Sequence, residues 1–152
     1  MKQETVLELF DRCGDSVYRV ALSYLRSPQE AEDAAQTVFL KLLERDIQIY
    51  PGKERAFLTK MTVNHCKNLL SAAKRQGTVP LDEAVLLAQP EDRELFRAVM
   101  ELPERYRTVV CLHYFEGYSF QEIAQLLHIG ASAVSMRLYR ARNMLKKRVG
   151  RY

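Results

Sequence analysis

The sequence predicts an all-α protein made of two small helical domains joined by a linker. Apolar residues recur at steps of three and four along most of the 152 residues, which is the period of an amphipathic helix. The chain has only six glycines and five prolines, and no stretch of any extent alternates apolar with polar residues as a strand does. A composition of 47% hydrophobic and 28% charged residues is typical of a folded chain.

The first domain begins with two predicted helices. Apolar positions on one face predict a helix over residues 4–26, with Gly14 as a soft break within it. The stretch Ser27-Pro28-Gln29-Glu30 then offers a serine N-cap, a proline at the first helical position and a glutamate at the third. We therefore expect a second helix to begin there and to run to about residue 45.

A connector over residues 46–54 contains the turn signal Tyr50-Pro51-Gly52, and a third helix follows over residues 55–74. Its predicted buried side consists of Phe57, Leu58, Met61, His65 and Leu69. Polar and basic residues occupy another side, among them Lys60, Asn64, Lys67 and Asn68. Such a stripe is typical of a solvated face, and its charge alone does not distinguish that reading from a binding surface.

We predict a linker at residues 76–91. The composition changes there, because the stretch 76–92 holds four acidic residues and no basic one. The domains are accordingly expected at residues 1–75 and 92–152. In the second, one helix ends at Leu102-Pro103, and the next is closed by Gly117 as its C-cap.

A helix-turn-helix follows. Ser119 and Glu122 form a capping box that begins its first helix, and His128-Ile129-Gly130 is the break, where a histidine can adopt positive φ. Val134 and Leu138 give the second helix an apolar seam. The opposite face carries Ser132, Ser135, Arg137 and Arg140. This arrangement puts side chains into a DNA major groove, although an ordinary helical hairpin gives a similar pattern.

The charge distribution favours a polyanionic partner. The formal net charge is +4, yet residues 93–152 hold eleven basic and five acidic residues, with no acid after Glu122. Phosphate neutralisation by such a surface supplies the non-specific part of DNA binding. A solvated helix face remains the alternative reading.

We find no catalytic residue, cofactor motif or metal site in the sequence. No phosphate loop or nucleophile elbow is present, and the three histidines are isolated from one another and from the cysteines. Cys13, Cys66 and Cys111 have no ligand spacing and are expected to be buried free thiols. No apolar run approaches a membrane span, and Met1 leads directly into an amphipathic helix, so we expect a cytoplasmic protein without membrane insertion.

Two separated stretches together resemble the extracytoplasmic-function (ECF) sigma factors of bacterial RNA polymerase. Residues 31–40, with Asp33, Gln36 and Phe39, resemble the family's second conserved region. Residues 102–107, 114–124 and 134–142 resemble its fourth region. The helix-turn-helix alone is shared with many response regulators, whereas the Asp-x-x-Gln-x-x-Phe pattern makes the match specific.

The resemblance implies a role for each set of residues. Asp33, Gln36 and Phe39 would dock on the β′ clamp of core polymerase, and the second domain would meet the β flap. The set Lys60, Asn64, Lys67 and Asn68 would capture the promoter −10 element, with Tyr50 as a base-stacking candidate. The helix-turn-helix would read the −35 element through Ser132, Ser135, Arg137 and Arg140, with phosphate contacts from Ser119 and Gln121. An anti-sigma protein is a further implied partner.

The predicted function is therefore promoter recognition and transcription initiation with core polymerase, without catalysis by the chain itself. The alternative is a stand-alone helix-turn-helix regulator that binds duplex DNA, which leaves the Asp33-Gln36-Phe39 helix unexplained. An enzyme or a protein-interaction module has no motif in its support. The chain departs from the family at Ser135, where Lys or Arg is common, and at Asn68, where Asp is common.

Overall fold

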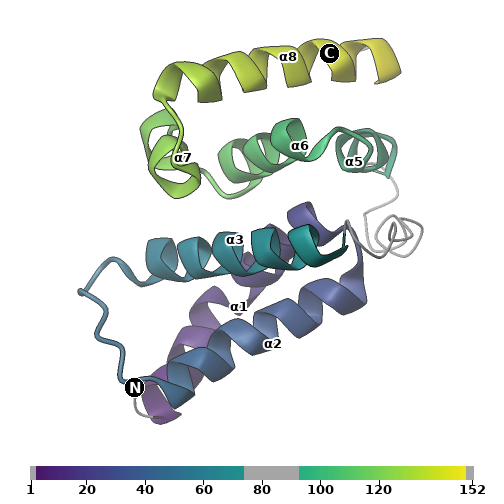
Figure 1. Cartoon of the computed structure of the whole chain (residues 1–152). Helices are drawn as coiled ribbons and strands as arrows, with labels where there is room; N and C mark the ends of the chain where they lie inside the picture. Colours follow the sequence, from purple (N-terminus) through teal and green to yellow (C-terminus); the bar gives the residue numbers. More distant parts are fainter. Residues whose placement is uncertain (1–2, 74–92, 150–152) are drawn as a thin grey trace. The chain divides into compact units, whose positions relative to one another are not determined.

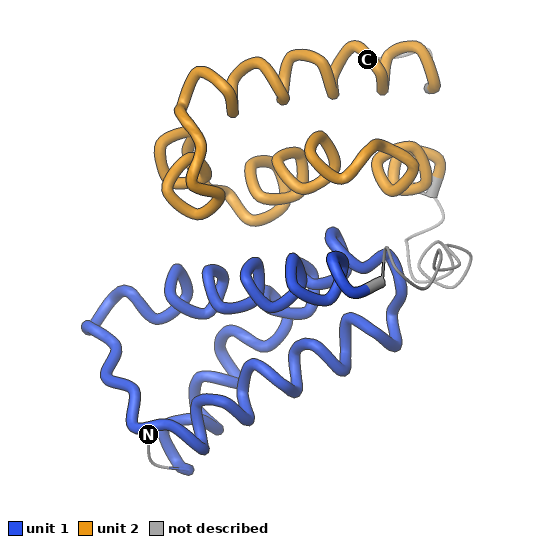
Figure 2. The backbone as a smooth tube through the Cα atoms, viewed as in Figure 1, with its two compact units in different colours: residues 1–79 blue, residues 80–152 orange. Residues whose placement is uncertain are grey.

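The computed structural model describes residues 3–73 and 93–149, and within these ranges the chain is helical with no strand. Two compact units divide the chain, residues 1–79 and residues 80–152 (Figure 2). Each unit is described by itself. The all-α prediction is confirmed, whereas the predicted linker, residues 76–91, lies outside the described residues.

Unit 1 is built from α1 (Gln3–Leu25), α2 (Pro28–Glu44) and α3 (Glu54–Ala73) (Figure 1). A tight turn joins α1 to α2. Arg26 takes the left-handed conformation at φ 63° and donates its backbone N–H to the Leu22 carbonyl at 2.9 Å. Ser27 then caps α2, because its Oγ accepts the Glu30 N–H at 3.3 Å and Pro28 occupies the first helical position. The predicted start of this helix is confirmed.

The core of unit 1 lies where the apolar faces of the three helices meet. Its buried residues include Leu9 and Val17 from α1, Val38 and Leu42 from α2, and Leu58 from α3. The helix α1 continues unbroken through Gly14, so the expected soft break is wrong. A methyl group at Gly14 would lie 3.6 Å from the Phe10 ring, which is ordinary packing distance and needs no bend.

The buried side of α3 differs from the prediction. Leu58 is fully buried as expected, but Phe57, Met61 and His65 are only half-buried and Leu69 is exposed. Thr62 is buried in addition, because its hydroxyl donates to the Leu58 carbonyl at 2.7 Å. That internal hydrogen bond lets a polar side chain occupy a position that apolar periodicity does not predict.

Unit 2 consists of α5 (Arg93–Met100), α6 (Glu104–Val110), η2 (Cys111–Phe115), α7 (Phe120–Leu127) and α8 (Ala131–Val149). The long helix α8 contacts α5, α6 and α7. Arg107 is buried at the α5–α6 turn, where its Nη1 donates to the Leu102 carbonyl at 3.0 Å. Leu102-Pro103 ends the preceding helix, as predicted.

The segment η2 is a turn of π-helix that continues α6, and the sequence did not predict it. The Glu116 N–H donates to the Cys111 carbonyl five residues earlier, and Gly117 follows with φ 77°. His113 then fixes the corner before α7, because its Nδ1 lies 2.8 Å from the Tyr118 carbonyl oxygen. A carbonyl only accepts, so Nδ1 carries the hydrogen. The prediction of Gly117 as the closing residue is confirmed.

Candidate functional site

The helix-turn-helix predicted from Ser119 onward is present as α7, a short turn and α8. Ser119 Oγ accepts the Glu122 N–H at 3.1 Å, and Glu122 Oε1 accepts the Ser119 N–H at 2.9 Å. This is the predicted capping box. His128 ends α7 in the left-handed conformation, at φ 57° and ψ 44°. The next helix begins at Ala131, and Val134 and Leu138 bury its predicted seam.

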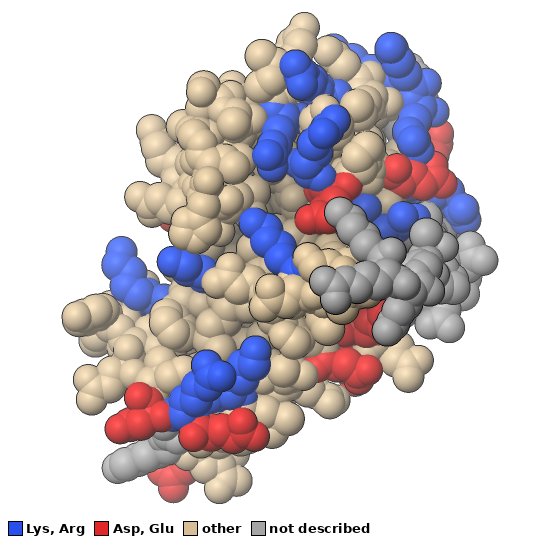
Figure 3. Space-filling model, viewed as in Figure 1, with Lys and Arg blue, Asp and Glu red and all other residues tan. Residues whose placement is uncertain are grey.

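The outer face of α8 carries the residues predicted to read duplex DNA. Ser132, Ser135 and Arg140 are exposed on it, and Arg137 is half-buried. The helix contains six basic residues and no acidic one. On the face drawn in Figure 3, Lys and Arg gather over the carboxyl-terminal part of α8, whereas its amino-terminal part presents mainly uncharged atoms.

Two exposed apolar residues on α8 escaped the sequence prediction. Met136 has an exposed fraction of 49% and Tyr139 one of 64%. Both lie between the predicted DNA-reading residues. Their spacing from the buried Val134 was the available signal, since it puts them on the opposite side of the helix.

The two residues predicted to contact phosphate differ in their hydrogen-bonding state. The Ser119 backbone N–H and Oγ are both used inside the capping box, which leaves the hydroxyl hydrogen for an outside acceptor. Gln121 lies in the first turn of α7 with its side chain exposed. The amide of Gln121 is therefore the freer of the two groups for binding a phosphate oxygen.

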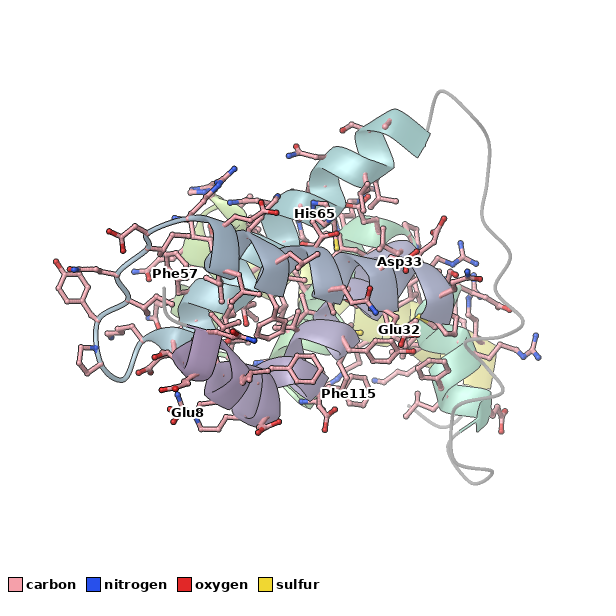
Figure 4. The ribbon with its side chains drawn as sticks, turned by 90° about the horizontal axis from the view of Figure 1, so that it is seen from below. Glu8, Glu32, Asp33, Phe57, His65 and Phe115 are labelled. Atoms are coloured by element: carbon pink, nitrogen blue, oxygen red, sulfur yellow. The ribbon has the colours of Figure 1, made fainter. Side chains whose placement is uncertain are left out.

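The stripe predicted along α3 is on the surface. Lys60, Asn64 and Asn68 are exposed and Lys67 is half-buried, so these side chains line one side of the helix. His65 lies beside them on α3 (Figure 4). Burial, and to a smaller extent the positive charge of Lys41, lowers the pKa of His65 below 6.5, so the ring is neutral near pH 7.

The loop between α2 and α3 holds Tyr50 away from the core. The Lys53 N–H donates to the Tyr50 carbonyl at 3.0 Å, and Gly52 has φ 83°. This is a type II turn with Pro51 and Gly52 at its centre. Ile47 and Ile49 pack against the core, whereas the Tyr50 side chain is 82% exposed. The loop thus presents an aromatic ring on a defined turn.

The three residues predicted for polymerase docking do not share one environment on α2. Asp33 and Gln36 are exposed, whereas Phe39 is 6% exposed and belongs to the core. The Phe39 ring meets the edge of Phe10 from α1, with 5.2 Å between ring centroids. Figure 4 shows Asp33 on α2 next to Glu32.

Sequence reasoning missed the exposed leucines that adjoin Asp33 and Gln36. Leu40 and Leu43 lie on the outer side of α2, with exposed fractions of 52% and 42%. Leu40 follows Gln36 by four residues, which is one turn of helix. Asp33, Gln36, Leu40 and Leu43 thus form one continuous outer face, which we call the α2 face.

Unit 2 contains an apolar groove of about 230 Å³ between α5, η2 and α8. Its lining includes Leu95, Tyr114, Phe115, Leu138 and Arg142. Tyr114 and Phe115 are exposed at its edge, where the Arg142 Nη2 donates to the Tyr114 hydroxyl at 3.1 Å. The π-helical turn η2 supplies both aromatic side chains.

Within residues 3–73 and 93–149 no group of His, Cys, Asp and Glu side chains is placed to hold a metal ion. Cys13, Cys66 and Cys111 are buried free thiols, as predicted, and burial raises the pKa of Cys111 to about 12. A thiol with so high a pKa is a poor nucleophile. Among the described helices, none has the length and apolar character that a membrane span requires.

Comparisons with known proteins find both halves of the chain in one family. Residues 9–76 match the family described as sigma-70 region 2, and residues 92–145 match sigma-70 region 4. The ECF RNA polymerase sigma factor SigM of Mycobacterium tuberculosis is 30% identical over 149 residues, covering 94% of this chain and 76% of that protein. The RNA polymerase sigma factor SigV of Bacillus subtilis is 26% identical, covering 95% of this chain and 93% of that protein.

Solved structures share the fold. The sigma factor RpoE from Bartonella quintana, in complex with the anti-sigma factor NepR, matches with a TM-score of 0.79 at 17% identity over 99% of both chains. The structure of CnrH in complex with the cytosolic domain of CnrY matches with a TM-score of 0.69 at 22% identity, covering 98% of this chain and 90% of that one. Together with the matches along the sequence, this shows that the chain belongs to the ECF sigma factors, the promoter-recognition subunits of bacterial RNA polymerase.

Proposed function

We propose a division of labour in which residues 1–75 bind core polymerase and capture the −10 element, and residues 92–152 read the −35 element. Residues 76–91 would connect the two, and the chain would perform no catalysis of its own. The observation that carries the proposal is the presence in one chain of the exposed α2 face and of a capped helix-turn-helix whose last helix has no acidic residue. A stand-alone DNA-binding regulator has no use for the first of these features.

Core polymerase would dock on the α2 face through the coiled coil of its β′ clamp. Apolar side chains with polar neighbours are the usual centre of such a contact. Leu40 and Leu43 supply the apolar part here, and Asp33 and Gln36 supply the polar part. Phe39 would act as a positioning residue, since its buried ring packs α2 against α1.

The −10 element would be held as a single strand between α3 and the loop that carries Tyr50. Lysine side chains track a phosphate backbone, and an exposed aromatic ring stacks on an unpaired base. The side chains placed to track the backbone are those of Lys60, Asn64, Lys67 and Asn68 on α3. The ring placed to stack on a base is that of Tyr50.

The −35 element would be read by α8 in the major groove, with Ser132, Ser135, Arg137 and Arg140 toward the DNA. Ser119 and Gln121 would meet the phosphate backbone at the start of α7, where free N–H groups favour an anion. The apolar groove of unit 2 would receive the β flap. The known complex of RpoE with an anti-sigma factor supports an anti-sigma partner for this chain as well.

Run-off transcription tests the proposal. Purified core polymerase is combined with the chain on fragments of its own genome, and new specific transcripts are expected only when the chain is present. Leu40→Asp should abolish them and weaken core binding about tenfold or more, because a charge replaces a central apolar contact. Leu40→Met keeps the apolar surface and serves as the matched control. Duplex binding without core binding or transcripts would instead support the stand-alone regulator.

A further inference from the structure

The outward face of α8 contains an apolar side chain that none of the proposed roles uses. Met136 lies two residues from both Val134 and Leu138, which are buried. At about 100° per residue its side chain leaves the helix roughly 160° from each of them. Met136 therefore lies on the outward face of the helix, with 49% of its surface exposed.

The residues around Met136 form an uncharged stripe between two basic flanks. Steps of four, three and four residues lead along the outward side of the helix through Ser132, Met136, Tyr139 and Asn143. Arg137 and Arg140 lie on one flank, and Arg142 and Lys146 lie on the other. Charged side chains thus border the face, and its centre is neutral from Ser132 to Asn143.

That arrangement matches the chemistry of a duplex groove. Phosphates line both edges of the major groove, and the base edges form its floor. A helix lying in the groove points its flanks at the phosphates and its central stripe at the bases. The side chain at the centre of the stripe therefore contacts bases, whichever residues hold the backbone.

We propose that Met136 reads the C5-methyl group of a thymine in the −35 element, with Tyr139 extending the apolar contact one turn further along α8. Thymine alone among the four bases presents a methyl group in the major groove, and an apolar side chain is the group that recognises it. Methionine is unbranched and adapts its shape to such a surface. The inference rests on the proposed −35 role of α8.

The neighbouring side chains support this choice of base. A guanine is usually read by an arginine or lysine that reaches its O6 and N7 atoms together. The first six residues of α8, Ala131 to Met136, contain no basic side chain. Ser132 and Ser135 are short and bind any base edge, so the strongest base preference available to the first turns of α8 is that of Met136.

Replacement of single thymines by deoxyuridine tests the inference. Deoxyuridine pairs as thymine does but lacks the methyl group. On a promoter found by run-off transcription, each thymine of the −35 element is replaced on either strand, and promoter binding by the holoenzyme is measured. The wild-type chain should lose about threefold to fivefold in affinity at one or two positions, the value of one buried methyl group. Met136→Ala should bind thymine and deoxyuridine templates equally, and Met136→Leu should keep the difference.

A flank substitution provides the control. Lys146→Ala should weaken binding to every template by a similar factor, because a lysine that neutralises phosphate does not distinguish bases. Equal binding of wild-type holoenzyme to all deoxyuridine templates would overturn the inference and leave the proposed function standing. So would a Met136→Ala chain that still prefers thymine. If the wild-type holoenzyme did not bind the unmodified promoter, the proposed function would be overturned as well.

Discussion

Phe39 and Leu40 are neighbours on α2, but one is buried and the other is exposed. Substitutions at the two positions should therefore separate effects on the stability of the fold from effects on polymerase binding. Phe39 is buried against Phe10, whereas more than half of the Leu40 side chain is exposed. We predict that Phe39→Ala lowers the free energy of unfolding by about 3 kcal/mol, through lost burial and the cavity it leaves. Leu40→Ala should change it by less than about 0.5 kcal/mol. Urea unfolding of the full chain measures both.

Core-polymerase binding at a temperature where both variants are folded completes this prediction. Leu40→Ala should bind core polymerase more weakly than the wild type despite its unchanged stability. A Phe39→Ala chain that unfolds like the wild type would show that the Phe39 ring is not part of the core. A conservative Phe39→Leu chain provides the control, because it retains most of the buried apolar surface.

His65 makes the stability of unit 1 depend on pH. Burial lowers its pKa in the folded state below 6.5, with a smaller contribution from Lys41. The unfolded chain therefore binds a proton more readily than the folded chain does, so stability falls as the pH decreases through 6.5 toward the folded-state pKa. Above the unfolded value both states are neutral at this site and the effect vanishes.

The corresponding prediction compares His65→Gln with the wild type. The variant should lose less stability between about pH 7.5 and about pH 5.5, because it removes the titrating group. Thermal unfolding across that range measures the difference. Parallel curves for the two chains would show that protonation of His65 is not coupled to unfolding.

At the scale of elements, the loop between α2 and α3 depends on one glycine. Gly52 has φ 83°, a conformation that L side chains rarely adopt, although nothing lies within 4 Å of the position a Cβ would take. The cost of a substitution there is therefore backbone strain and not a steric clash. Tyr50 is the first residue of the same turn. A strained turn would therefore change the position of the ring that is proposed to stack on a base.

We predict that Gly52→Ala costs about 1 kcal/mol in the turn and lowers promoter opening. Core-polymerase binding should be unchanged, since the α2 face lies outside the loop. Gly52→Asn is the matched control, because asparagine tolerates positive φ better than alanine. Base reactivity of the −10 region in holoenzyme complexes measures opening. Equal opening with all three residues would show that the geometry of the turn does not matter.

The elements that begin or end on a local hydrogen bond were predictable from the sequence. Ser27 and Ser119 each cap a helix within four residues, and His128 closes α7 in the left-handed conformation. The π-helical turn at Cys111–Phe115 was not predictable, because the local sequence pattern does not distinguish a single turn of π-helix from α-helix. The buried side of α3 was partly wrong for a similar reason, since Thr62 satisfies its hydroxyl internally.

In the candidate site, too, the features that depend on contacts between helices could not be predicted from the sequence. The pattern of Asp33, Gln36 and Phe39 selected α2 as the proposed docking helix, but periodicity does not say whether an aromatic residue at the border of the apolar stripe turns inward. Phe39 turns inward because Phe10 of another helix is there to meet it. Met136 was missed because a single exposed apolar residue has no pattern of its own. Its role is inferred from its position on α8, opposite the buried seam of that helix.

At the scale of the whole molecule, each unit is compact by itself, so polymerase binding and −35 recognition should be separable by mutation. We predict that Arg140→Ala, on the exposed face of α8, binds core polymerase like the wild type and loses about tenfold in transcription from a promoter that needs its −35 element. Leu40→Asp should lose both activities, because without polymerase binding no promoter is read. On a promoter that is transcribed without a −35 element, wild type and Arg140→Ala should give equal transcription, since α8 then makes no contact that distinguishes them. An Arg140→Ala chain that also failed to bind core polymerase would mean that the two units act as one surface.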